Sequence, residues 1–185
     1  MTKFFEETND KNQEAIFGAL SSFLRAENYS GKRLFINEKG GLQFLIAILK
    51  RPNLTIRLKK KVLFLLNDIL NTDDLIFPEG KKGEVASLLA YNNDFTDHLI
   101  DMLVEASIDI ENGQMWDLRE NLLSVLRDLI KQNDEIRLKH SQILKLHKLK
   151  LAQGLQKCEH DVQSLYMKEI KLVNECENEQ SDHNP

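Results

Sequence analysis

The sequence has few residues that break or cross-link a chain: its 185 residues include three prolines, eight glycines and two cysteines. So few breakers leave long stretches in which helices can form. Cys158 and Cys176 are too few for a disulfide framework, and on one continuous helix they would lie about 27 Å apart. Two free thiols are therefore expected, with a bridge across a helix hairpin as the alternative.

Long apolar runs and a net basic charge are also absent. No apolar run reaches the ~20 residues that span a bilayer, and residues 1–10 lack the apolar core of a signal peptide. The net charge of −4 provides no overall basic field for nucleic acid. We therefore expect a protein that binds neither membrane nor nucleic acid. We also expect it to be a monomer.

Sequence motifs for catalysis or for metal and cofactor binding are missing. There is no glycine-rich phosphate loop, GxSxG, HExxH or paired CxxC. His140 and His147 are seven positions apart and share one helix face, where a solvated or capping pair is favoured over metal ligands or a catalytic base. We expect no catalytic residue, no cofactor site and no metal site, so an enzyme is the weakest hypothesis.

Helical periodicity is what the sequence does contain. Apolar residues recur at i, i+3 and i+4 in nearly every patterned segment, which predicts an all-α protein. One apolar frame occurs three times, in residues 13–25, 59–71 and 119–131. Its three copies are Ile16, Phe17, Ala19, Leu20, Phe23 and Leu24; Val62, Leu63, Leu65, Leu66, Ile69 and Leu70; and Leu122, Leu123, Val125, Leu126, Leu129 and Ile130.

The segments between these copies follow a three-helix order. After a first helix at 11–27, we expect a short helix at 33–38, a glycine turn at 39–41, a helix at 42–50 and a long helix at 56–71. A three-helix unit of about 40–47 residues is typical of an armadillo repeat. Equivalent helices that stack side by side would bury the repeated frame. The predicted fold is an armadillo-like helical-repeat solenoid.

The domain organisation follows from these units. Residues 1–153 are expected to be armadillo-like repeats and the C-terminal part of a longer solenoid, since only ten residues precede the first helix. The third unit is longer because of an expected exposed loop at 72–83. Gly154 is the expected break before a capping helix at 154–174, and 175–185 is expected to be a disordered tail.

The third helix of each armadillo unit lines the concave surface, so a partner would contact the positions that the frame leaves exposed. Phe64 is the one aromatic there, and is either an interface anchor or a core residue in a shifted register. Asp68 and Asp128 are either partner contacts or links between neighbouring helices. The exposed stripe on the first helix also includes Ser21, and that on the last includes Ser124. The predicted partner-binding residues are Arg25, Lys60, Phe64, Asn67, Asp68, Asn71, Arg127, Asp128 and Lys131.

Three further features have open interpretations. The basic run at 57–61 is either a solvated face or a contact for an acidic partner. Trp116 is expected to pack the preceding loop onto the last long helix, with a partner contact as the alternative. Asn28 and Asn53 begin N-x-[ST] sequons in predicted breaks, so they are possible glycosylation sites.

Residues 31–70 and 117–130 resemble the Sil-one family of nucleotide exchange factors for BiP, the heat-shock-seventy-class chaperone of the endoplasmic reticulum. The matching segments are RLFINEKGGLQFL, RLKKKVLFLLNDIL and DLRENLLSVLRDLI, and the long insert before the last helix is also similar to this family. The resemblance covers about residues 11–150. The sequence lacks a signal peptide, the early repeats and a KDEL-type retention signal.

The resemblance implies a function and a location. A member of this family would bind the nucleotide-binding domain of BiP with its concave face, open the nucleotide cleft and promote ADP release in the lumen of the endoplasmic reticulum. The alternatives are a cytosolic exchange factor of the Fes or Hsp-binding-protein type and an armadillo-type protein-binding scaffold. The scaffold is disfavoured because the asparagine ladder of such grooves is absent: Ser21 and Arg127 are the equivalents of Asn67. An RNA-binding repeat protein ranks lower because the exposed stripe has mixed charge.

Overall fold

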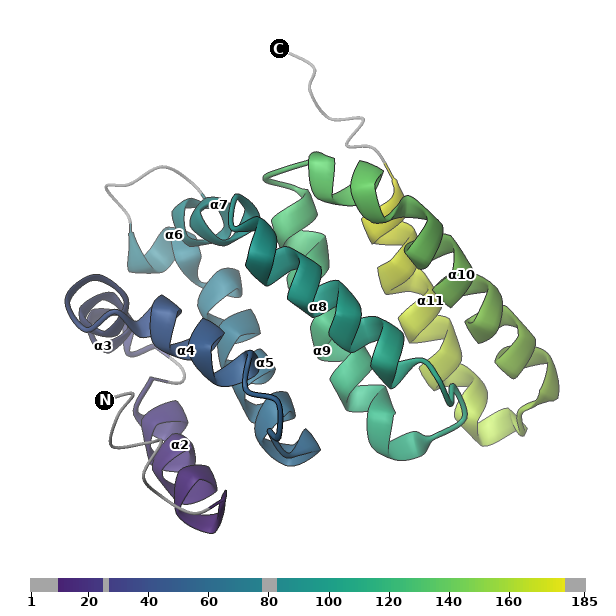
Figure 1. Ribbon diagram of the computed structural model, residues 1–185, viewed down its shortest axis with the longest axis horizontal. Coiled ribbons are helices and arrows are strands. Elements are labelled where there is room, and N and C mark those ends of the chain that lie inside the picture. Colours follow the sequence, from purple (N-terminus) through teal and green to yellow (C-terminus); the bar gives the residue numbers. More distant parts are fainter. Residues whose placement is uncertain (1–9, 25–26, 78–82, 179–185) are drawn as a thin grey trace. The chain divides into compact units, whose positions relative to one another are not determined.

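The computed structural model describes residues 10–24, 27–77 and 83–178, and every regular element in these ranges is a helix (Figure 1). The prediction of an all-α protein is therefore confirmed. None of the helices in these ranges is both long and apolar enough to cross a bilayer. The chain divides into two compact units, residues 1–85 and 86–185, which are described separately.

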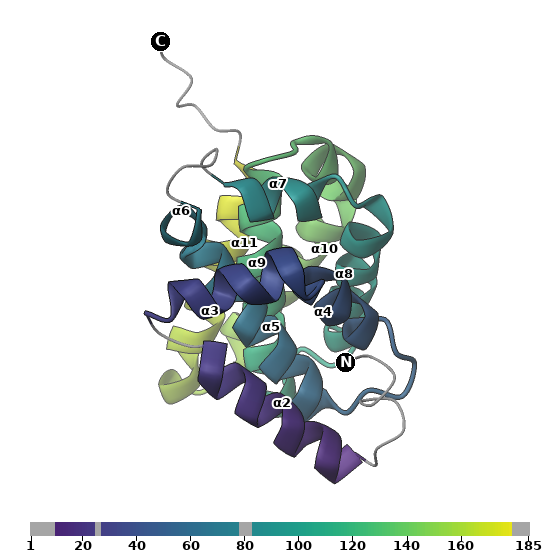
Figure 2. The same ribbon diagram turned by 90° about the vertical axis from the view of Figure 1, so that its left-hand side faces the viewer.

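The first unit is built around the long helix α5. Figure 2 shows this unit from the side on which α2, α3 and α4 lie against α5. Its helices are α2 (Asp10–Leu24), α3 (Tyr29–Arg33), the π-helical turn η1 (Leu34–Glu38), α4 (Gly41–Leu49), α5 (Ile56–Asn71) and α6 (Asp73–Ile76).

Local chemistry sets the boundaries of these helices. Asn28 caps α3, because its Oδ1 accepts a hydrogen bond from the backbone N–H of Gly31 at 3.0 Å. Gly40 has φ 62° before α4, a conformation that glycine adopts cheaply, as the glycine turn predicts. Thr55 caps α5 by accepting from the N–H of Leu58 at 3.3 Å.

The second unit is a bundle of four longer helices, with α8 and α11 packed on α9 and with α10 packed on α11. Helix α7 begins just before the boundary between the units, and the short 3₁₀ turn η2 joins α10 to α11. The bounds are α7 (Glu84–Ala90), α8 (Asn93–Ala106), α9 (Gly113–Ile130), α10 (Glu135–Lys157), η2 (His160–Val162) and α11 (Gln163–Glu177).

The repeated apolar frame is buried in two of its three copies. All six frame positions of α5 and all six of α9 are buried, as the pattern predicts. In α2 only Phe17 and Leu24 of the frame are buried, whereas Ala19 and Phe23 are exposed. The difference arises because the described neighbours of α2 are α5 and α3, so that one narrow face of the helix is covered. The prediction of a fully buried frame in the first copy is wrong.

Two predicted boundaries are also wrong. Helix α10 continues through Gly154 to Lys157, and the turn comes at Cys158 instead. A Cβ at Gly154 would lie 2.6 Å from Tyr166 Cε1, so glycine is there to let α11 approach. The capping helix predicted at 154–174 is observed as α11, which continues to Glu177, so the disordered tail predicted from residue 175 is helical in its first three residues. Residues 179–185 of this predicted tail lie outside the described residues.

The expected exposed loop at 72–83 is partly ordered. Its first residues form the short helix α6, and buried Asp73 accepts a hydrogen bond from the N–H of Val85 at 2.8 Å. This bond closes the loop because it links the start of α6 to the start of α7. Residues 78–82 lie outside the described part of the chain.

Truncation of a frame residue should destabilise the unit that contains it. Leu126 is fully buried in α9, so Leu126→Ala should lower the free energy of unfolding by about 2–5 kcal/mol through the cavity it leaves. The control is Leu138→Ala on α10, where the side chain is 62% exposed and the expected loss is below about 0.5 kcal/mol. Urea unfolding followed by the fluorescence of Trp116, the single tryptophan, reports on this unit. Equal losses in the two variants would contradict the assignment of the core.

Candidate functional site: helix faces for partner binding

Helix α5 presents one polar face with an aromatic at its centre. Lys60, Phe64, Asn67 and Asn71 are spaced at i, i+4, i+7 and i+11, so they share one face opposite the buried frame. Phe64 is 48% exposed, which agrees with the anchor interpretation and contradicts a shifted register. Asn71 Nδ2 donates a hydrogen bond to Asn67 Oδ1 at 3.4 Å, which orders the polar end of the stripe.

Asp68 links two helices of the first unit. Lys32 on α3 is completely buried, and its Nζ lies 2.9 Å from Asp68 Oδ2 and donates to Thr72 Oγ1 at 2.9 Å. Asp68 Oδ2 accepts no hydrogen bond from the described residues, so its contact with Lys32 is an ion pair held chiefly by Coulomb attraction. The side chain of Asp68 is still 27% exposed. Of the two interpretations of Asp68, the structure supports the link between neighbouring helices.

The equivalent stripe on α9 is covered by α11. Arg127 Nε donates to Asp128 Oδ1 at 2.9 Å, and Arg127 Nη1 donates to Glu175 Oε2 of α11 at 3.4 Å. The hydrogen bond to Asp128 raises the pKa of Arg127. Lys131 Nζ donates to Asp128 Oδ1 at 3.3 Å. The three predicted partner-binding residues on this helix are thus engaged within the unit.

Two residues expected on exposed stripes are instead buried: Ser124 on α9 and Ser21 on α2. Ser124 shares a face of α9 with Glu120 and Arg127, which pair with Lys168 and Glu175 of α11. Ser21 lies on the same face of α2 as buried Phe17 and Leu24. Their predicted exposure is wrong. Arg25 lies outside the described residues.

The basic run at 57–61 makes contacts inside the first unit. Arg57 Nε lies 3.3 Å from Glu14 Oε2 of α2, and Lys61 Nζ donates to the carbonyl of Glu14 at 3.5 Å. Glu14 thus links both ends of the basic run to α2. Arg57 is largely exposed, so this ion pair contributes little to stability.

A buried ion pair in the second unit was not predicted. Arg119 of α9 is fully buried, and its Nε and Nη2 donate to the two carboxylate oxygens of Glu169 of α11 at 2.7 and 3.2 Å. Arg119 also donates to the carbonyl of Ala106, the last residue of α8, and to the carbonyl of Ile110 in the loop that follows. One guanidinium therefore joins α8, the loop after it, α9 and α11. The sequence did contain a signal for this buried charge: Arg119 is three and four positions before Leu122 and Leu123 and so shares their apolar helix face.

His147 extends this network into α10. Its Nε2 lies 3.0 Å from Glu169 Oε1, and its Nδ1 lies 2.9 Å from Ser107 Oγ. Serine, histidine and glutamate in a chain could suggest a hydrolase. However, Ser107 is only 3% exposed and its hydroxyl also donates to the carbonyl of Leu103, so no substrate reaches it. The cluster holds helices together.

The two histidines of α10 share a face, as expected, but both are buried, so the prediction of a solvated pair is wrong. His140 Nε2 lies 2.9 Å from Asp97 Oδ1 of α8. Lys139 also hydrogen-bonds to Asp97 and, together with His140, lowers the pKa of that carboxyl although desolvation opposes the shift. Within the described residues, no group of three or more His, Cys, Asp or Glu is arranged to hold a metal ion.

Trp116 lies in the first turn of α9. Its Nε1 donates to the carbonyl of Ile110 at 3.3 Å, and its ring meets Tyr166 of α11 edge-on with centroids 5.8 Å apart. It therefore packs the preceding loop onto the helix, and this structural interpretation is confirmed.

The two sequons differ in their surroundings. The side chain of Asn28 is used in the structure, since besides capping α3 it donates to the carbonyl of Phe23 at 2.8 Å. Asn53 lies exposed in the turn before α5. Of the two, Asn53 is the more accessible to a glycan-transferring enzyme.

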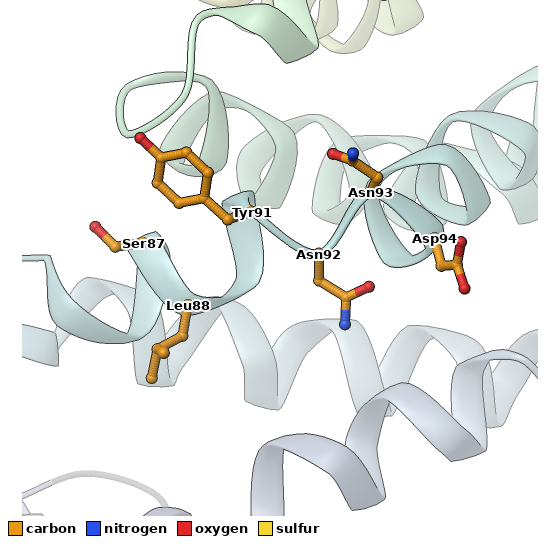
Figure 3. A pocket seen from close by; sticks show the side chains of 6 residues that line it. All are labelled: Ser87, Leu88, Tyr91, Asn92, Asn93 and Asp94. Atoms are coloured by element: carbon orange, nitrogen blue, oxygen red, sulfur yellow. The ribbon is translucent and has the colours of Figure 1, made fainter.

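An open hollow of about 660 Å³ lies at the junction of α7 and α8 (Figure 3). Leu88 and Tyr91 are exposed there, but their side chains point in different directions and do not form one apolar contact. Asn92 is used to cap α8 by accepting from the N–H of Phe95. The side chains that line this hollow do not point toward a common ligand position.

Comparison of the chain with models of known protein families, with curated protein sequences and with solved structures finds no match. The interpretation of these surfaces therefore depends on the geometry described above.

Removal of the Glu169 charge should expose how much the second unit depends on Arg119. Glu169→Gln leaves a buried guanidinium without its counter-charge and should lower the free energy of unfolding by about 3–5 kcal/mol. The control is Lys168→Ala, which breaks an exposed ion pair with Glu120 and should cost less than about 1 kcal/mol. Trp116 fluorescence in urea measures both. A loss below about 1 kcal/mol for Glu169→Gln would contradict the role given to this pair.

The two thiols are free, as expected, and should differ in reactivity. Burial raises the pKa of Cys176 to about 12, so it is almost entirely protonated at pH 8 and shielded from reagents. Cys158, only partly buried at the end of α10, should react. A thiol titration with a disulfide reagent should find one reactive group in the native protein and two after denaturation. Rapid reaction of both thiols in the native protein would contradict the structure.

Proposed function

We propose that the protein is a nucleotide exchange factor for the heat-shock-seventy-class chaperone BiP and acts in the lumen of the endoplasmic reticulum. The observation that carries the proposal is the α5 face, where a half-exposed Phe64 lies among Lys60, Asn67 and Asn71 in a helix that resembles the Sil-one family. The all-helical fold is compatible with the armadillo-like solenoid that this function would use. The protein would act as a monomer and not as an enzyme.

The contact would be made chiefly through α5. A large aromatic ring surrounded by polar groups is typical of an interface anchor, because it buries much apolar area at little conformational cost. Lys60 and the two asparagines would supply hydrogen bonds around it. Arg127, Asp128 and Lys131 are engaged with one another and with α11, so they would contribute less than the sequence alone predicts.

Exchange would follow from preferential binding to one state of the chaperone. If α5 contacts the open nucleotide-binding domain better than the closed one, ADP affinity falls by the same factor. A tenfold loss of ADP affinity needs about 1.4 kcal/mol of this preference. ADP must in turn weaken binding of the exchange factor tenfold.

The test uses Phe64→Ala, with Phe23→Ala as the matched control. Both rings are exposed in the first unit, but Phe23 belongs to α2 and is not one of the residues of the α5 face. The Phe64 variant should weaken chaperone binding by about 2 kcal/mol or more, slow the release of fluorescent ADP from BiP and leave thermal unfolding nearly unchanged. The Phe23 variant should behave as wild type.

Two results would overturn the proposal. ADP release that Phe64→Ala leaves unchanged would remove α5 as the contact. A wild-type chain that accelerates ADP release from neither BiP nor a cytosolic chaperone would remove the exchange activity. Acceleration with the cytosolic chaperone alone would favour the Fes or Hsp-binding-protein type.

A further inference from the structure

Helix α10 is rich in basic residues in an acidic protein. It carries six lysine and arginine residues and one acidic residue, Glu135, whereas the whole chain has a net charge of −4. Three of its leucines are also exposed: Leu138 (62%), Leu146 (56%) and Leu149 (60%). These three leucines do not belong to the buried side of α10. That side is formed by Ile136, His140, Leu144, His147, Leu151 and Gly154.

A groove runs along this helix beside its exposed leucines. It has a volume of about 650 Å³ and lies against the C-terminal end of α11, where Glu177 borders it. Leu144, Leu149 and Ala152 give it an apolar floor and wall, and Arg137, Lys145 and Lys148 line it with positive charge. Lys148 Nζ is 2.6 Å from Glu177 Oε2 and Arg137 Nε is 2.6 Å from Asp134 Oδ1, whereas Lys145 forms no ion pair with any residue in the described ranges.

We propose that this groove binds an acidic amphipathic segment of a partner protein, with an apolar side chain between Leu149 and Ala152 and carboxylates near Lys145. The proposal concerns a second surface and does not depend on the exchange activity. Charge complementarity selects an acidic segment, because Lys145 offers an unneutralised positive charge beside apolar area. The apolar contacts provide affinity and the charges provide orientation, as in other grooves that accept an amphipathic helix.

Other occupants fit this groove less well. A second copy docked through the same face would bring two basic helices together, which like-charge repulsion opposes. The chain's own last residues, 178–185, contain no large apolar side chain for the floor of the groove. A membrane surface is disfavoured because Gln142 and Lys145 lie on the same face as Leu138 and Leu149 and would enter the apolar layer.

A selection from a random peptide library, with peptides about 16 residues or ~24 Å long as helices, tests the proposal on the full chain. Peptides enriched on the wild type should combine Asp or Glu with Leu, Ile or Phe. Lys145→Glu and Leu149→Asp should each weaken their binding by about tenfold or more. The control Lys157→Glu makes the same charge change about 18 Å further along α10 and should alter binding by less than about twofold. Circular dichroism checks that each variant is folded.

Several outcomes would overturn the proposal. Enrichment of no acidic apolar sequence, or equal binding to wild type and Lys145→Glu, would remove the groove as a peptide site. Binding to phosphatidylserine vesicles that Leu149→Asp abolishes, without peptide enrichment, would identify a membrane surface instead. A concentration-dependent doubling of mass in light scattering that Leu149→Asp abolishes would identify a second copy of this chain as the occupant.

Discussion

The second unit depends on a single buried ion pair, Arg119 with Glu169. A guanidinium without solvent is costly unless its donors are used, and Arg119 makes four hydrogen bonds to one carboxylate and two carbonyls. Those partners belong to three different segments of the chain, so that the charge can be buried only when all three are in place. His147 adds α10 through the same carboxylate. The pair therefore selects one arrangement of the helices, which apolar packing alone would specify less sharply.

The first unit solves a similar problem with a lysine. Lys32 on the short helix α3 is buried against Asp68 and Thr72 of α5, so a segment of five residues that could not be stable alone is held by charge. In both units, one member of the ion pair lies on the long helix that carries the repeated frame: Asp68 on α5 and Arg119 on α9. As a consequence, the carboxylate of Asp68 is engaged within the unit and is only 27% exposed.

Much of the fold could be predicted from the sequence, because apolar periodicity, caps and glycines act locally. The bounds of α5 agree with the pattern, and Gly40 adopts the positive φ that its turn requires. The errors arise where a distant segment decides. Gly154 was expected to break a helix, but it makes room for Tyr166. Phe23 matches the frame but is 60% exposed, and Ser124 was expected on the surface but lies buried between Glu120 and Arg127, which pair with α11. Spacing along one helix cannot reveal which other helix covers a face.

The same limit explains why the surfaces that the structure leaves exposed differ from those that the sequence predicts. Sequence alone treats the outer stripes of α5 and α9 as equivalent, since their frames match. In the structure α11 covers the α9 stripe, where Lys168 pairs with Glu120 and Glu175 pairs with Arg127. Glu169 holds α11 in this position through its ion pair with the buried Arg119. The α5 stripe keeps its exposed aromatic. In the second unit the exposed apolar and basic groups lie on α10 instead, so the helix that completes the bundle also determines which face remains for a partner.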